Sequence, residues 1–101
     1  MTSVEEKNET QVIDDGSVLL QNYPNPFNIS TDIQFSLRTG GFVSLKVYNL
    51  LGQEIATLAS EELPAGNHSR QWNPNGVPDG VYFYRLQAGS YSETKRLLLL
   101  R

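Results

Sequence analysis

Polar and apolar residues alternate along much of the chain. The run Asp32–Leu37 places its three apolar side chains on one side, and Phe42–Asn49 alternates in the same way. Alternation with a period of two is typical of strands that bury one face. The residues between the two runs, Arg38–Gly41, favour a turn, so the two runs are predicted to pair as a hairpin.

Five further runs are predicted to be strands, separated by loops rich in glycine, proline and asparagine. They are Val18–Tyr23, Glu54–Ala59, Asn67–Asn73, Gly80–Ala88 and Tyr91–Leu100. In Glu54–Ala59 the apolar residues Ile55 and Leu58 do not share one face, which predicts a bulge, or a short helix in place of the strand. About seven short strands at this spacing predict an all-β protein, an antiparallel β-sandwich.

The last two runs are predicted to form a hairpin around Gly89-Ser90, because glycine supplies the positive φ of a two-residue turn. Alternate residues of the first arm are predicted to point inward, namely Tyr82, Tyr84 and Leu86. A buried tyrosine hydroxyl needs a partner, and Tyr82 lies where it can bond back to the backbone of the preceding loop.

The second arm of this hairpin ends in four consecutive leucines, Leu97–Leu100. A half-buried strand alternates, so this run needs apolar surroundings on both faces. Either the strand is central in its sheet and covered on both faces, or one face is exposed and available to a binding partner.

The segment Pro24-Asn-Pro-Phe-Asn28 is predicted to be a stiff corner between strands. Each proline fixes its own φ and biases the preceding residue toward extended geometry. Phe27 is the expected anchor of this corner in the core, and Trp72 is also predicted to point inward.

Charge divides the chain of 101 residues into two parts. Residues 1–17 hold five acidic residues and one basic residue, whereas residues 18–101 hold six acidic and seven basic residues. Residues 18–101 are predicted to form one domain, and residues 1–17 an acidic linker or the tail of an upstream module. An edge strand built on Gln11–Ile13 is the alternative.

Composition argues against several classes of protein. Apolar residues make up 39% and charged residues 19%, which is ordinary for a folded domain. The nearly neutral domain has no basic stripe for a nucleic acid, and no apolar run reaches the roughly 20 residues of a membrane span. No signal peptide is visible, so the chain is expected to be part of a longer protein.

No set of residues for catalysis can be assembled from the sequence. The single histidine, His68, is predicted to pack and bond locally at the rim, and there is no cysteine for a zinc site. Glu61 and Glu62 should point to opposite faces of an extended chain. The loop Asn73–Asp79 resembles a calcium loop only faintly, and turn chemistry explains its residues. The chain is therefore predicted to be no enzyme and to need no cofactor.

Five segments in their order resemble the C-terminal sorting domain of the bacterial type IX secretion system. They are Leu20–Asn28, Val43–Glu54, Leu63–His68, Gly80–Gly89 and Lys95–Arg101. Ile29 stands where a proline often follows in that family, and Arg70 stands where an apolar residue is usual. The resemblance covers residues 18–101 and implies an immunoglobulin-like β-sandwich, close to a domain of flagellar hook-capping proteins. The residues expected to build this fold are Tyr23, Pro24, Asn25, Pro26, Phe27, Asn28, Gly52, Gly66, Trp72, Gly80, Tyr82, Tyr84 and Leu86.

The resemblance also implies a role. Such a domain ends a secreted protein whose export signal lies at its start, and the outer-membrane translocation machinery reads it in the periplasm. In many members a sortase then removes the domain and joins the cargo to a surface glycolipid. The chain is therefore expected to be a non-catalytic sorting signal for an upstream cargo that reaches the cell surface or the exterior.

The last strand is the expected read-out segment, because leucines on both faces suit recognition by strand pairing and side-chain pockets. Four residues are expected to supply affinity, namely Leu97, Leu98, Leu99 and Leu100, and three to supply orientation, namely Lys95, Arg96 and Arg101. The alternative is that the leucines only complete the core.

Two other functions stay open. A structural or adhesive module could self-associate through a strand added from residues 1–17. A sugar-binding module attached to a secreted hydrolase could use outward aromatic side chains, for which Tyr48, Phe83 and Tyr91 are the candidates.

Overall fold

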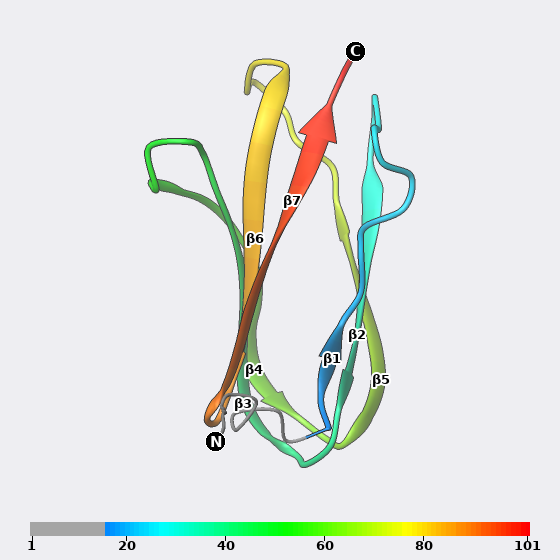
Figure 1. Ribbon diagram of the computed structural model, residues 1–101, viewed down its shortest axis with the longest axis vertical. Helices are drawn as coiled ribbons and strands as arrows, with labels where there is room; N and C mark the ends of the chain where they lie inside the picture. Colours follow the sequence, from blue (N-terminus) through cyan, green and yellow to red (C-terminus); the bar gives the residue numbers. More distant parts are fainter. Residues whose placement is uncertain (1–15) are drawn as a thin grey trace, which may run out of the picture.

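The computed structural model describes residues 16–101, which form two antiparallel sheets stacked face to face (Figure 1). These residues contain seven strands and no helix. The strands are β1 Val18–Leu19, β2 Thr31–Leu37, β3 Gly41–Tyr48, β4 Glu54–Leu63, β5 Gly66–Trp72, β6 Gly80–Ala88 and β7 Tyr91–Leu99. The predicted all-β, immunoglobulin-like sandwich is therefore confirmed. The edge strand considered at Gln11–Ile13 lies outside the described residues.

The smaller sheet has the strand order β1-β2-β5, and the larger sheet has the order β4-β3-β6-β7. Neighbouring strands are antiparallel in every pair. The C-terminal strand β7 therefore lies at an edge of the larger sheet and is paired with β6 on one side only.

β2 and β3 belong to different sheets, so the predicted hairpin between them is wrong. The turn that joins them carries the chain from the smaller sheet to the larger one. Both strands do bury their apolar faces, but these faces meet across the core instead of lying side by side in one sheet. Alternation identifies the buried face of a strand and does not identify its hydrogen-bonding partner.

β4 pairs with β3 through two irregularities, which confirm the predicted bulge. The register skips Leu58 between Ala59 and Thr57, and it skips Ile55 between Ala56 and Glu54. The two apolar residues that broke the alternation are therefore the extra residues of the bulges.

The β6–β7 hairpin and its inward residues are confirmed. Its two-residue turn has Gly89 at φ +61°, the left-handed conformation that glycine adopts without strain. The three inward residues are almost fully buried, namely Tyr82, Tyr84 and Leu86.

The core lies between the sheets, and an aromatic group closes one end of it. Phe27 is 3% exposed and anchors the corner 24–28, as predicted. The Trp72 ring lies 5.8 Å from the Phe27 ring and 5.5 Å from the Tyr82 ring, measured between centroids. The corner, β5 and β6 are thus held together by contacts between aromatic rings.

Candidate functional site

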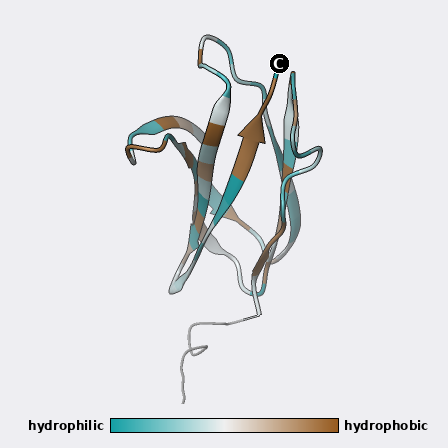
Figure 2. Cartoon of the chain, turned by 45° about the horizontal axis from the view of Figure 1, so that its top comes forward, coloured by the Kyte–Doolittle hydropathy of each residue, from teal (hydrophilic) through white to brown (hydrophobic). Residues whose placement is uncertain are grey.

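The end of β7 carries two kinds of leucine. Leu97 and Leu99 lie in the core, with exposed fractions of 1% and 0%, and they complete it. Leu98 is only half-buried and Leu100 is 51% exposed, so these two side chains remain available for contact. The C-terminal half of this strand has a continuous hydrophobic colour in Figure 2, because all four leucines are apolar.

The outer edge of β7 is partly occupied by the chain's own segment 21–27, which we call the clasp. Phe27 N–H donates to the Leu98 carbonyl at 3.0 Å, and the Phe27 carbonyl accepts from Leu100 N–H at 2.9 Å. These two bonds form a short parallel bridge between Phe27 and Leu99, which are far apart in the sequence. The last residues of β7 are therefore bonded on both edges.

Two side chains of the clasp extend this pairing. Asn25 Oδ1 accepts a hydrogen bond from Leu98 N–H at 3.0 Å. Gln21 Nε2 donates to the Arg96 carbonyl at 2.8 Å. An incoming strand could pair fully with residues 96–100 only by displacing the clasp, because four outward backbone groups there already have partners, namely the carbonyls of Arg96 and Leu98 and the N–H groups of Leu98 and Leu100.

The basic residues of the predicted read-out segment differ in their surroundings. Lys95 Nζ lies 3.4 Å from the Glu93 carboxylate. Arg101 is tied to Asp79, with 3.1 Å between Nη1 and Oδ1 and 2.9 Å between the backbone N and Oδ2. The exposed Arg96 guanidinium has no ion-pair or hydrogen-bond partner among residues 16–101.

Leu98 and Arg96 point to the outer face of the larger sheet, away from the smaller sheet. The β6–β7 register places Val81 beside Leu98 and Phe83 beside Arg96. The β3–β6 register then places Tyr48 beside Phe83. The outward side chains of three strands thus form one surface, apolar apart from its arginines, that begins at the C-terminus.

A shallow hollow of about 290 Å³ lies on this surface, lined by Tyr48, Phe83, Arg85 and Thr94 among others. The Arg85 guanidinium carbon lies 5.8 Å from the centre of the Tyr48 ring, and Arg85 Nε donates to Thr94 Oγ1 at 3.1 Å. We call the whole outward surface the outer patch and define it as Tyr48, Val81, Phe83, Arg85, Arg96, Leu98 and Leu100.

The sequence model of one protein family, described as the secretion system C-terminal sorting domain, matches residues 21–100. The chain belongs to this family. No match was found among curated proteins. The family predicted from the sequence is thus confirmed, and the domain is a C-terminal sorting domain for type IX secretion, so the protein that carries it is exported.

Tyr84 lies at the centre of the sorting domain and is fully buried. Its hydroxyl donates to the Leu20 carbonyl at 2.7 Å and accepts from Asn22 N–H at 2.9 Å. Burial raises the pKa of Tyr84 to about 12, although the Asn22 hydrogen bond opposes this rise. The Glu93 charge adds to the increase.

Tyr82 behaves as the sequence predicts for a tyrosine that follows a turn. Its hydroxyl donates to the Pro78 carbonyl at 2.5 Å, which ties β6 to the loop before it. Gly80 and Gly66 begin the strands β6 and β5. Gly52 has φ +80° in the β3–β4 turn, where its N–H donates to the Asn49 carbonyl at 3.0 Å.

The remaining corner residues of the sorting domain lie at its surface. Tyr23 is 79% exposed and meets Asp32 of β2 through backbone hydrogen bonds. Pro24, Pro26 and Asn28 are exposed. Only Phe27 of this corner enters the core, so the exposed residues shape the clasp and add little to packing.

Tyr91 was expected on the outer surface and is instead 6% exposed, so this expectation is wrong. Side chains of a strand alternate, and Leu97 and Leu99 point inward, so Tyr91 on the same parity must point inward too. Its hydroxyl donates to Glu93 Oε1 at 2.5 Å. Of the three aromatic residues considered for sugar binding, only Tyr48 and Phe83 face outward.

Two of the residues considered for catalysis, His68 and Glu61, make local contacts. His68 Nε2 lies 2.8 Å from the Pro64 carbonyl, and its ring stacks on Phe35. Glu61 accepts a hydrogen bond from Arg70 at 2.9 Å. Residues 16–101 contain no group of three or more His, Cys, Asp or Glu residues that could hold a metal ion.

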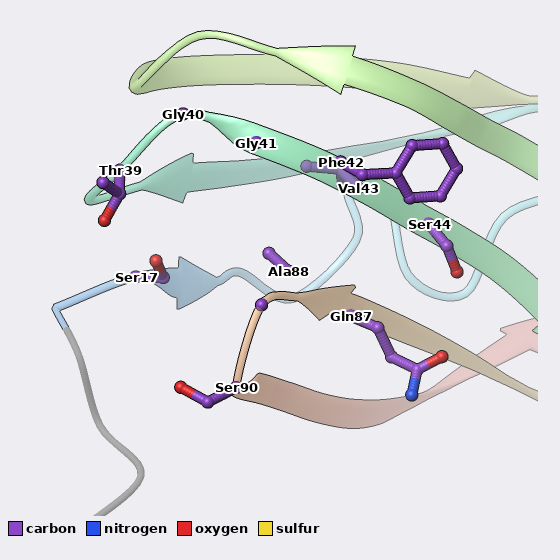
Figure 3. A pocket seen from close by; sticks show the side chains of 11 residues that line it. Ser17, Thr39, Gly40, Gly41, Phe42, Val43, Ser44, Gln87, Ala88 and Ser90 are labelled. Carbon is purple, nitrogen blue, oxygen red and sulfur yellow. The ribbon is translucent and has the colours of Figure 1, made fainter.

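A further hollow of the described domain lies at the end opposite the C-terminus, between the β2–β3 turn and the β6–β7 hairpin (Figure 3). Its volume is about 620 Å³, and its lining is glycine, serine and other uncharged residues such as Phe42 and Gln87. This lining offers no acid, base or histidine for chemistry. The described residues also include no helix long and apolar enough to cross a membrane.

Proposed function

We propose that this domain acts without catalysis and directs an attached upstream cargo across the outer membrane through the type IX machinery. The family match over residues 21–100 carries the proposal. The cargo would pass through the periplasm and end at the cell surface or outside the cell.

We further propose that the machinery reads the segment Lys95–Arg101. The exposure of Leu98 and Leu100 supports this assignment, because apolar side chains at a surface are suited to a partner's pocket. The burial of Leu97 and Leu99 assigns them to the fold. Arg101 is held by Asp79, so Arg96 is the basic residue best placed to orient a partner.

The test is a fusion of residues 16–101 to a reporter that bears an export signal, produced in a host with the type IX machinery. We expect the reporter outside the outer membrane. The mass of the exported reporter would tell whether a sortase has removed the domain, as we propose. A reporter that stays in the periplasm with the domain folded would contradict the proposed function.

The read-out segment is tested by Leu98→Asp and Leu100→Asp, singly and together. We expect the reporter to stay in the periplasm, because a charge placed in an apolar contact must be desolvated. The matched control is Val18→Asp with Leu20→Asp on the smaller sheet, where exposures of 44% and 46% resemble that of Leu100. Circular dichroism must show that each variant is folded, and normal export of folded variants would count against this segment.

A further inference from the structure

A partner could recognise the C-terminal segment in two ways, by pairing with the backbone at the edge of β7 or by contacting side chains on the outer face of the sheet. The hydrogen bonds of β7 distinguish these two ways. Even-numbered residues of β7 direct their backbone groups outward, as the bonds of residues 96, 98 and 100 to the clasp show. That part of the edge is therefore occupied. The outward groups of Ser92 and Thr94 and the Arg96 N–H make no hydrogen bond to the clasp, so the open part of the edge lies mostly before the predicted read-out segment.

The outer patch is uncovered over the same stretch of chain. The smaller sheet packs only against the inner face of the larger one, so it leaves the patch exposed (Figure 1). The described chain starts at the other end of the sandwich, near the β6–β7 hairpin.

The charged side chains of the patch are all positive. The outward positions of β6 and β7 include two arginines, Arg85 and Arg96, and no carboxylate. On β3, Lys46 is 3.3 Å from Glu54, so that pair is locally balanced. The patch thus combines an apolar centre with an excess of positive charge on a domain that is nearly neutral as a whole.

We propose that the type IX machinery reads the folded domain through the outer patch, using a protein surface with an apolar centre and carboxylates around it. This inference rests on the proposed function. The partner surface is expected to carry carboxylates because they complement the charges of Arg85 and Arg96. It is expected to have an apolar centre because that centre would contact the row formed by Leu98, Val81 and Phe83. An anionic lipid surface fits less well, because lipid-binding sites cluster about four to eight basic residues.

The deciding variant is Arg85→Glu with Arg96→Glu in the reporter fusion. We expect export to fall by about tenfold or more, because like charges brought together across an interface weaken binding strongly. The matched control is Arg38→Glu with Arg70→Glu, which makes the same change in net charge away from the patch. The ion pair that Arg70 makes with Glu61 is exposed, so its loss should leave the fold intact.

A second variant, Ser92→Pro, tests the open edge. Its lost N–H points away from β6, and proline is tolerated at such positions of an edge strand. Reading by the patch predicts normal export of this variant. Loss of export with the fold intact by circular dichroism would show that strand pairing is used and would overturn the proposal.

A third measurement addresses lipid. The purified domain is mixed with vesicles of phosphatidylcholine, with and without phosphatidylglycerol, and the patch predicts no binding to either. Binding to the anionic vesicles that is lost in Arg85→Glu with Arg96→Glu would overturn the proposal in favour of a membrane surface. If the unmodified fusion is exported and the patch variant is exported equally well, only this inference fails. If the unmodified fusion is not exported, the proposed function itself fails.

Discussion

At the scale of single residues, Tyr84 connects parts of the chain that lie far apart in sequence. Its hydroxyl donates to the Leu20 carbonyl and accepts from the Asn22 N–H, and Asn22 is almost fully buried. The Asn22 side chain in turn donates to Thr31 Oγ1 at 2.9 Å. One hydroxyl thus fixes the start of the clasp against β6, and its loss would leave buried polar groups unpaired.

We predict that Tyr84→Phe lowers the free energy of unfolding at pH 7 by about 1–3 kcal/mol, the usual cost of an unpaired buried group. Tyr84 has a pKa near 12 in the folded domain, above its ordinary value of 10. The hydroxyl therefore stabilises the domain fully below pH 10, and this stabilisation is lost as the pH rises toward 12. The difference between the two proteins should shrink over that interval, measured by urea denaturation.

Tyr23→Phe is the matched control for this prediction, because Tyr23 is 79% exposed. It should change stability little at either pH. A Tyr84→Phe variant that keeps a constant deficit from pH 7 to pH 12 would contradict the assignment of the high pKa to Tyr84.

At the scale of elements, the clasp determines what β7 can pair with. Pro24 and Pro26 have no N–H, so the pairing uses the Phe27 backbone and the side chains of Asn25 and Gln21. A regular strand would continue this pairing along the whole edge. The clasp instead covers only the C-terminal part of β7, where an open edge would be a site for unwanted association.

We predict that Asn25→Ala speeds hydrogen exchange at the Leu98 amide, which loses its acceptor. The Leu100 amide should be much less affected, because its acceptor is the Phe27 carbonyl. The free energy of unfolding should fall by about 0.5–1.5 kcal/mol, the net value of one hydrogen bond. Asn28→Ala, an exposed asparagine in the same corner, is the control, and an equal effect from both variants would contradict this role of Asn25.

Much of this architecture is predictable from local pattern. Approximate strand positions, the β6–β7 hairpin and the inward Tyr82, Tyr84 and Leu86 follow from alternation and turn residues, because these depend on neighbours in sequence. The predicted bounds are wrong for two strands, since β1 ends at Leu19 instead of Tyr23 and β4 continues to Leu63 instead of ending at Ala59. The anchoring role of Phe27 follows because it is the one large apolar residue within its corner.

The remaining features depend on long-range contacts. Asn25 and Leu98 are 73 residues apart, and no periodicity predicts that they meet. The β2–β3 turn could equally have joined two strands of one sheet, since both have one apolar face. The outer patch combines residues of three elements, so it becomes visible only when the register of β3, β6 and β7 is known.

At the scale of the whole molecule, β7 is both part of the core and the proposed signal. Odd-numbered Leu97 and Leu99 are sealed between the sheets, while even-numbered Leu98 and Leu100 face outward. Deleting the end of the chain therefore removes two functions at once. A truncation that blocks export would say little about recognition unless the fold of the truncated domain were measured.

We predict that a chain ending at Arg96 loses its cooperative fold. Removing even one buried leucine side chain costs about 2–5 kcal/mol, and two such losses approach the roughly 5–15 kcal/mol that stabilises a typical domain. A chain ending at Leu99 keeps both core leucines and should unfold cooperatively, at a somewhat lower temperature, because the ion pair of Arg101 with Asp79 and the Leu100 contact to the clasp are lost. Thermal unfolding by circular dichroism separates the two. A sharp transition in the chain ending at Arg96 would mean that Leu97 and Leu99 are dispensable for folding, and the division of β7 into a core face and a recognition face would then be wrong.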